Sequence, residues 1–481
     1  MIQPSNVLIP ETEIRPNKNN KKVASYILAI IFIFLRFIWD GRELLVTFSI
    51  VQFLIMAILI IAIIIKNRPL AFVLIIFDML DYGLLINPNA LGFAGVLKFK
   101  DFELALLFIT ILLLIISPPE IKKSKNELTK LYKLFAIIFL IIFIYSLTFQ
   151  NLAFVLRSAR NITVYFIFFS IPFFIRDKDD FKIVIYGFLI CMMLSSTTHI
   201  LQTIIFPKNT LLPFAETTML SGRINRLYGS TQPFNLFGLF VLITYLSLNK
   251  NNSIKLNLMT IIVFLAIILT FTRSYSLFAI FGIFLLVIIV KNKQNTLFTI
   301  KNLIAFSLVT IIFLSLLSIY STKGNDLFYS FSDRSKDNTF FYHVDYIFTS
   351  NELIKFNNGS VLLGLGFQLI NRGKLLSGGN DIDELFSTFN SDSGWATLNV
   401  TMGLLGVLFF IYFLMIIIKL TYKLLRSDYS ILIKSLSGSL FVYCVFVPIL
   451  WLVSAHGLWY ESALVLTLNT GLLERGLTLN V

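Results

Sequence analysis

The chain has 481 residues, of which 57% are hydrophobic and only 14% are charged. A water-soluble domain carries about 25% charged residues, so this composition excludes a soluble globule and indicates that a lipid bilayer is the solvent. The net charge of +14 comes from Lys and Arg scattered between apolar segments, and this scatter argues against a nucleic-acid-binding surface. Cys191 and Cys444 lie far apart in apolar stretches and predict neither a disulfide framework nor a metal site.

The N-terminal segment, residues 1–22, is polar and basic, and no small-residue cleavage site precedes the first apolar run. We interpret this segment as a retained cytoplasmic tail. After it, about fourteen segments meet the requirement of roughly 20 mainly apolar residues for a membrane span. We therefore predict an all-α, polytopic integral membrane protein in which residues 1–481 form a single integrated transmembrane domain. The predicted spans lie near residues 23–39, 43–65, 70–86, 102–117, 133–149, 161–175, 182–206, 234–249, 256–272, 275–290, 302–320, 396–418, 431–453 and 457–473.

The orientation of these spans follows from the lysines of the connection at 120–132, because cytoplasmic loops retain positive charge. Strict alternation from that loop places both termini in the cytoplasm and the connections at 221–232 and 321–395 outside. The segment 321–395 is much longer than any other connection. We expect it to form a long external loop subdomain that folds over the membrane surface.

The first candidate site is the external segment S-G-R-I-N-R-L-Y-G-S-T-Q-P-F-N-L-F-G at 221–238, which leads into a span. Gly229 permits a tight turn, Pro233 suits the first turn of a helix, and the unpaired amides of that turn favour an anion. Arg223 and Arg226 add permanently charged planar groups that suit phosphate oxygens. A basic loop that contacts lipid headgroups is the alternative interpretation.

The second candidate is Arg273, which stands in the sequence L-T-F-T-R-S-Y-S between two apolar segments. A charge at the centre of a membrane helix costs on the order of 2.5 to 3.5 kcal/mol, and less near the interface. We therefore expect a partner for Arg273 on the outer side. The alternative is a side chain that extends to the lipid headgroups.

The third candidate is the long external loop. It contains S-D-R-S-K around Arg334 and L-G-L-G-F, in which Gly364 and Gly366 predict a tight bend. From Ser391, the sequence S-D-S-G-W-A-T-L-N-V-T-M-G-L-L-G carries the chain back into the bilayer, with Asp392 just outside the re-entry.

In this order and on this side of the membrane, the three elements resemble the O-antigen ligase and polysaccharide polymerase superfamily of membrane glycosyltransferases, over roughly residues 221–420. The resemblance includes a long external loop before a span with G-x-x-G. It implies a GT-C-like helical fold and a polyprenyl-diphosphate-linked glycan donor. It also implies that the external arginines Arg226, Arg273 and Arg334 engage the diphosphate, with Arg223 as a neighbour that has no clear motif match.

A general base must come from another residue type, because arginine stays protonated. Ligases of the superfamily tend to have a His in the long loop near the re-entrant helix, whereas this chain offers Asp392 there. Asp392 is the first candidate base, and helix capping is an equally good role for it. Glu216, Asp345 and His343 follow, although a plain surface role suits His343 better.

The other candidate substrate-binding residues flank these motifs or lie at the start of the sixth span: Tyr228, Gly229, Asn235 and Arg160. His199, His343 and His456 share no metal-ligand spacing, so we expect transfer without a metal ion or a cofactor.

The resemblance implies a polymerase for a surface polysaccharide, such as O-antigen, capsule or exopolysaccharide, in the bacterial cytoplasmic (inner) membrane. It would move a glycan from undecaprenyl diphosphate onto a lipid-linked repeat unit. A chain-length regulator and a flippase are further candidate partners. The alternatives are a ligase that transfers the finished glycan to a lipid A core or a protein, and a lipid-linked oligosaccharide flippase or transporter. The intramembrane carboxylates Asp78 and Asp81 in the third span suit a proton-coupled transporter, but a hydrogen-bonded interior pair near the outer face is the better interpretation. The long external loop argues against a flippase.

Overall fold

The computed structural model describes a predominantly helical molecule. Its described residues are 18–38, 46–80, 92–93, 97–116, 127–204, 217–220, 224–227, 232–249, 254–269, 273–290, 301, 350–352, 354–355, 359–367, 369–370, 387–388, 394–452 and 460–481. Most of the predicted loop subdomain and most of the predicted N-terminal tail therefore lie outside the described residues. The first helix already begins at Lys18, within that predicted tail.

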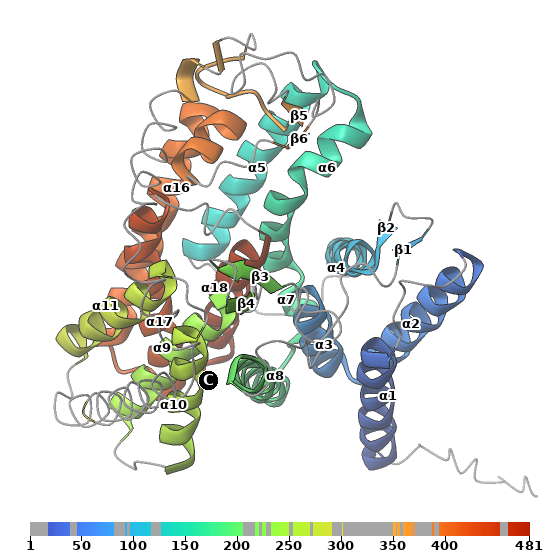
Figure 1. The fold of residues 1–481 in the computed structure, drawn as a ribbon, viewed down its shortest axis with the longest axis vertical. Coiled ribbons are helices and arrows are strands. Elements are labelled where there is room, and N and C mark those ends of the chain that lie inside the picture. Colours follow the sequence, from blue (N-terminus) through green and yellow to red (C-terminus); the bar gives the residue numbers. More distant parts are fainter. Residues whose placement is uncertain are drawn as a thin grey trace, which may run out of the picture.

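Among the described residues, the first half of the chain forms eight α-helices and one 3₁₀ helix, and Figure 1 shows their arrangement. These are α1 (Lys18–Ile38), α2 (Val46–Lys66), α3 (Arg68–Leu80), α4 (Phe99–Ile116), α5 (Glu127–Leu147), α6 (Leu152–Thr163), η1 (Val164–Phe169), α7 (Ile171–Phe174) and α8 (Lys178–Ile204). The sixth predicted span, 161–175, is thus a 3₁₀ segment between two α-helices. We have no sequence signal for this change of helix type.

The second half contributes the helices α9 (Gln232–Leu248), α10 (Ile254–Ile268), α11 (Arg273–Ile289), α16 (Gly394–Arg426), α17 (Ile431–Leu450) and α18 (Tyr460–Leu479). Three antiparallel two-stranded ribbons complete the described structure: β1 (Gly92–Phe93) with β2 (Leu97–Lys98), β3 (Thr217–Leu220) with β4 (Ile224–Leu227), and β5 (Leu369–Ile370) with β6 (Ser387–Thr388). The ribbons were not predicted from the sequence.

Four described helices are long and apolar enough to cross a membrane: Glu127–Leu147, Lys178–Leu201, Gly394–Arg426 and Ile431–Leu450. Shorter apolar helices accompany them over Lys22–Leu35, Val51–Lys66, Gln232–Leu248, Ile254–Ile268 and Tyr275–Leu286. The prediction of a helical membrane protein is confirmed at this level. The predicted span 302–320 lies outside the described residues.

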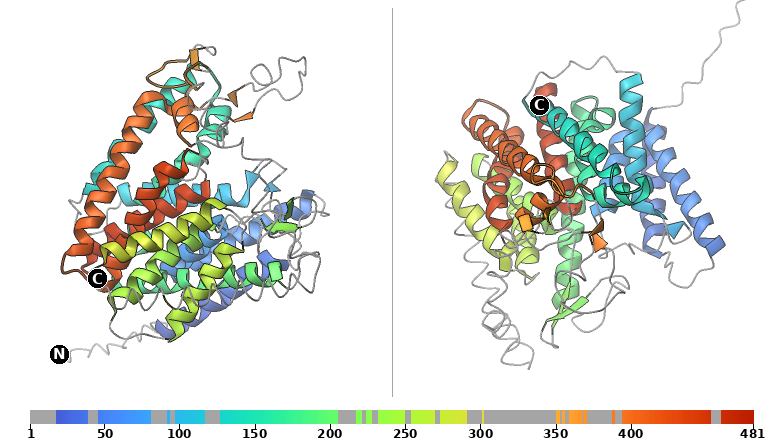
Figure 2. Two further views of the ribbon diagram at one scale, coloured as in Figure 1. Left: turned by 60° about the vertical axis from the view of Figure 1, so that its left-hand side comes forward. Right: turned by 90° about the horizontal axis from the view of Figure 1, so that it is seen from above.

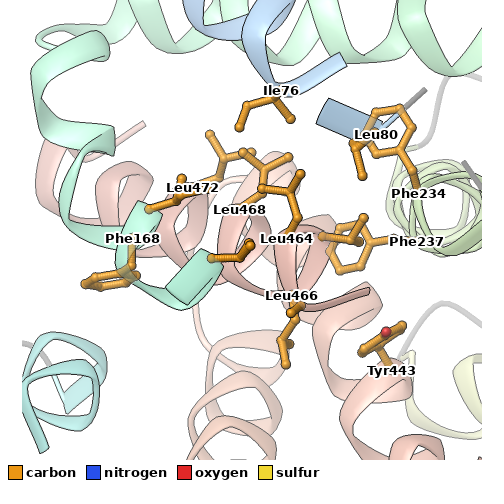
Figure 3. Packing of buried hydrophobic residues seen from close by; sticks show 14 of the residues in the cluster. Ile76, Leu80, Phe168, Phe234, Phe237, Tyr443, Leu464, Leu466, Leu468 and Leu472 are labelled. Atoms are coloured by element: carbon orange, nitrogen blue, oxygen red, sulfur yellow. The ribbon is translucent and has the colours of Figure 1, made fainter. Parts of the chain in front are cut away.

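The interior of the bundle is packed mainly by aliphatic and aromatic side chains. Figure 3 shows part of it, where Leu464, Leu468 and Leu472 of α18 lie among side chains of other helices, including Phe168 of η1. Polar side chains join some helices directly. Ser439 of α17 donates a hydrogen bond to the Phe237 carbonyl of α9 at 2.8 Å.

A glycine permits the close approach of α9 and α17. A Cβ atom at Gly438 would lie 2.6 Å from Oγ1 of Thr244, so a larger residue would push α17 away from α9. Small residues at such contacts matter in membranes, because lipid provides no hydrophobic drive for helices to associate.

Several hydrogen bonds join the segments between helices to one another and to the end of α18. We call this region the C-terminal end of the bundle. The bonds run from Arg475 to the carbonyls of Ile175 and Arg176 (2.7 and 2.8 Å), from Thr129 to Glu474 (2.9 Å), from Lys178 to the Asn480 carbonyl (2.9 Å), and from Ser430 to the Val481 carbonyl (2.7 Å). The first residues of α5, α8 and α17 therefore lie together with the last residues of α7 and α18.

Candidate functional site

Residues 359–367 form a compact turn that we call the clasp. Gly364 and Gly366 have φ angles of +70° and +72°, which favour glycine. Ser360 and Gly364 exchange backbone hydrogen bonds, with the Gly364 amide donating to the Ser360 carbonyl at 2.6 Å. The tight bend predicted from L-G-L-G-F is confirmed.

The clasp fills a break in α16 at Gly403, where φ is 63° and ψ is −164°. Around this break the helix loses its own hydrogen bonds, and the clasp replaces them. The bonds run from the Leu365 amide to the Val400 carbonyl (2.7 Å), from the Leu404 amide to the Val361 carbonyl (3.0 Å), and from the Leu405 amide to the Leu362 carbonyl (3.0 Å). An irregular helix is tolerated at membrane depth when protein groups satisfy its backbone in this way.

The clasp is also fixed to the last turn of α5. The Ser360 amide donates to the Tyr145 hydroxyl at 3.1 Å, and the Phe367 amide donates to the Ser146 hydroxyl at 2.8 Å. The Phe367 ring packs against Phe139, with centroids 5.2 Å apart. We call this part of the molecule, where α5 ends and α16 begins, the clasp end. It lies in the upper part of Figure 1.

The start of α16 is held by the end of α17. The Trp451 carbonyl accepts the Gly394 amide at 2.9 Å, and the Trp395 indole donates to the Pro448 carbonyl at 3.0 Å. The two tryptophan rings meet edge to face, with centroids 4.9 Å apart. The prediction that a helix begins near Trp395 is correct to one residue. Asp392 lies outside the described residues, so its predicted capping role stays a prediction.

Two of the predicted arginines lie on described elements. Arg226 lies on β4, opposite Thr218 of β3, and β4 packs against α8. In the left view of Figure 2, this green ribbon lies on the side of the molecule opposite the C-terminus. Arg273 is the first residue of α11, which packs against α9 and α10.

The third described element of this group is the first turn of α9. Asn235 there is 4% exposed, and its side-chain oxygen has no hydrogen-bonding partner among the described residues. Because α9 packs against both α8 and α11, the elements that carry Arg226, Asn235 and Arg273 belong to one connected group of helices. The unpaired atom is a hydrogen-bond acceptor and suits a ligand that carries a donor, such as a sugar hydroxyl, whereas the amides of a helix start suit an anion.

Arg160 forms an ion pair that the sequence did not reveal. One of its terminal nitrogens lies 2.6 Å from a carboxylate oxygen of Asp101, and both side chains are partly exposed. Asp101 directly precedes the fourth predicted span, and Arg160 directly precedes the sixth. The predicted alternation of spans places both residues on the same side of the membrane. This shared side was a signal for the pair that the sequence already contained.

His199 also received no role from its spacing to other histidines. In the structure its imidazole is buried on α8, which packs against α9, α10 and α3.

The remaining predicted site residues lie outside the described residues: Arg223, Tyr228, Gly229, Arg334, His343 and Asp392, together with the candidate bases Glu216 and Asp345. Their convergence with Arg226 and Arg273 stays a prediction.

No protein-family model matches the chain, and no curated protein is significantly similar to it in sequence. The superfamily named from the motifs therefore stays a resemblance.

Proposed function

We propose that this protein is a membrane glycosyltransferase that polymerises the repeat units of a bacterial surface polysaccharide. The donor is a glycan on undecaprenyl diphosphate, and the acceptor is a lipid-linked repeat unit on the outer face of the inner membrane. The observation that carries the proposal is the linked packing of the elements that bear Arg226 and Asn235 of the first motif and Arg273 of the second, because β4 packs on α8, α8 on α9, and α9 on α11.

The hydrogen bonds described above fall into two groups, one at each end of the bundle. This separation supports the proposed topology of about fourteen spans with both termini inside. Every bond given above for the C-terminal end joins connections predicted to be cytoplasmic or the first residues next to them. Every bond of the clasp joins segments predicted at or near the outer surface. If the spans were assigned wrongly, some of these bonds would join a segment predicted to be cytoplasmic to one predicted to be external.

In the proposed reaction, an acceptor hydroxyl attacks the anomeric carbon of the donor glycan. The new glycosidic bond forms as the bond from that carbon to the diphosphate oxygen breaks, and undecaprenyl diphosphate leaves with the bonding electrons. Arg226, Arg273 and Arg334 stabilise the charge that develops on the diphosphate. Asp392 accepts the proton of the hydroxyl.

A deletion strain complemented with variants tests the proposal. The strain lacking the gene accumulates single lipid-linked repeats and no long chains, and the wild-type gene restores the glycan ladder. Abundant lipid-linked long polymer in the deletion strain would instead favour the ligase.

In the same strain, Arg→Lys at Arg226, Arg273 or Arg334 removes directional contacts to the diphosphate while keeping the charge. We expect each to reduce polymerisation about a hundredfold to a thousandfold, the usual effect of losing one donor to a developing charge. Lys98→Arg in β2 and Lys100→Arg at the start of α4 are matched controls on the side predicted to be external, and they keep the wild-type ladder. Wild-type ladders from all three Arg→Lys variants at normal expression would contradict the anion site.

A further inference from the structure

Two amide side chains meet at the clasp end. Asn399, in the part of α16 that precedes the break at Gly403, donates two hydrogen bonds from its side-chain nitrogen. One goes to the hydroxyl of Ser350 at 2.8 Å, and the other goes to the side-chain oxygen of Asn351 at 2.9 Å. These bonds use both N–H groups of Asn399 and fix the plane of its amide. The oxygen of Asn399 and the nitrogen of Asn351 remain on adjoining groups as one acceptor and one donor.

The segment that carries Asn351 is fixed to the rest of the clasp end. Ile354 of that segment, Leu365 of the clasp and Val400 of α16 form a small buried apolar cluster. Asn351 is exposed and Asn399 is partly buried, so a ligand can reach the pair. Because the amides are already held in place, a ligand binds without the cost of first ordering these side chains.

An aromatic ring lies on the same face of α16. Trp395 precedes Asn399 by four residues, and side chains at this spacing are neighbours on a helix. Its partly exposed ring is fixed by the indole bond to the Pro448 carbonyl and by the edge-to-face contact with Trp451. The ring offers an apolar surface for the C–H face of a sugar, and an acceptor beside a donor matches two neighbouring sugar hydroxyls. Uncharged amides give a phosphate no counter-charge, so this chemistry suits the glycan and not the diphosphate.

We infer that Asn351 and Asn399, beside Trp395, form a sugar-binding subsite for the acceptor repeat unit. The inference rests on the proposed function, in which the acceptor is a lipid-linked repeat unit on the outer face. The subsite uses none of the proposed diphosphate-binding arginines. Binding of the glycan and binding of the diphosphate should therefore respond to different substitutions.

The probe is the free repeat-unit oligosaccharide, released by mild acid from the lipid-linked repeats of the deletion strain. Its binding to the full-length protein in detergent is measured by calorimetry, beside that of inorganic pyrophosphate. Asn351→Ala removes the donor, while Asn399 keeps its bond to Ser350. We expect the dissociation constant for the oligosaccharide to rise about fivefold to tenfold, the effect of losing one hydrogen bond, and that for pyrophosphate to stay unchanged. Glu352→Ala, at the next and equally exposed position, is the matched control and binds both probes normally.

Asn399→Ala removes the acceptor and also frees Asn351, so we expect an equal or larger loss of oligosaccharide binding. Thr401→Ala is its control, because the Thr401 hydroxyl bonds only within α16. If Asn399→Ala does not fold, the exposed Asn351→Ala still decides the question.

The outcomes separate the subsite from the proposed function. Normal oligosaccharide binding by both Asn→Ala variants overturns the inference, as does a wild-type protein that binds pyrophosphate but not the oligosaccharide. Equal weakening of both probes also overturns it, because it shows a general disturbance of the protein. A deletion strain without lipid-linked single repeats contradicts the proposed function, and the inference falls with it.

Discussion

Arg475 shows how one buried charge is accommodated at the C-terminal end of the bundle. The residue is 4% exposed, and burial lowers the pKa of its guanidinium, whereas Asp180 and Asp177 raise it. The group remains charged because arginine keeps its proton at any physiological pH. Its planar fork bonds two successive carbonyls, those of Ile175 and Arg176, just where α7 ends and leaves them without helical partners.

Replacement of Arg475 tests this arrangement. Arg475→Gln leaves at least one of the two carbonyls unpaired, so we expect a loss of about 2 to 3 kcal/mol in the free energy of unfolding. The measurement is the thermal or denaturant unfolding midpoint of the purified protein in detergent. Lys178→Gln is the matched control, because Lys178 also bonds a backbone carbonyl, that of Asn480, but from an exposed position. Equal midpoints for the two variants would contradict the structural role of Arg475.

At the scale of single elements, α16 is too long for one membrane crossing. Its 33 residues extend about 50 Å, whereas the hydrocarbon core of a bilayer is about 30 Å thick. The break at Gly403 resolves the difference, because the part from Leu404 to Arg426 extends roughly 34 Å and suffices for the crossing. The first part of α16 is then free to lie at the surface beside the clasp.

Gly403→Ala tests the joint between α16 and the clasp. The backbone angles at Gly403 are accessible essentially to glycine alone, and a Cβ atom there would collide with the Gly364 amide and the Leu362 carbonyl. We expect a loss of about 1 to 3 kcal/mol from strain. Hydrogen exchange then shows faster exchange at the Leu404 and Leu405 amides, which lose their partners in the clasp.

Thr401→Ala is the control for this substitution. Its hydroxyl donates within α16, at 2.7 Å to the Thr397 carbonyl, so its removal leaves the clasp in place. Unchanged protection of the Leu404 and Leu405 amides in Gly403→Ala would show that the clasp does not depend on the glycine.

The sequence predicted the helical character of the described chain, because length and apolar composition are local properties. The predicted starts at residues 234 and 275 differ from those of α9 and α11 by two residues each. The hydrogen bonding of the clasp to the break in α16 was not predicted, because the sequence G-x-x-G is equally compatible with an unbroken helix. The partners Asp101 and Arg160 lie far apart in the chain, and only the completed topology brings them to one side.

At the scale of the whole molecule, the contacts fix the direction of several helices. α5 runs from the C-terminal end, at Thr129, to the clasp end, at Ser146. α16 begins at the clasp end, and α17 runs back toward it, from Ser430 to Trp451. The chain thus leaves α5 and enters α16 at the same end, which requires an even number of crossings between them. The six spans predicted from 161–175 to 302–320 satisfy this requirement.

The two ends of the bundle should therefore face opposite sides of the membrane, and the charge rule assigns the C-terminal end to the cytoplasm. Cysteine labelling checks this after Cys191 and Cys444, both buried, are replaced by alanine. Val361 in the clasp and Asp428 between α16 and α17 are exposed positions for single cysteines. In intact cells, an impermeant maleimide should label Val361→Cys, and Asp428→Cys only after permeabilisation.

The possible results of this labelling bear on different conclusions. If both cysteines react in intact cells, the two ends share one side, and the directions assigned to α16 and α17 are wrong. If only Asp428→Cys reacts, the fold stands but the clasp faces the cytoplasm, where a polysaccharide polymerase would have no access to its lipid-linked substrates. Labelling of Val361→Cys alone leaves the clasp on the side where the proposed donor and acceptor meet. The orientation of the bundle therefore decides whether the arginine-bearing elements are placed for the proposed chemistry.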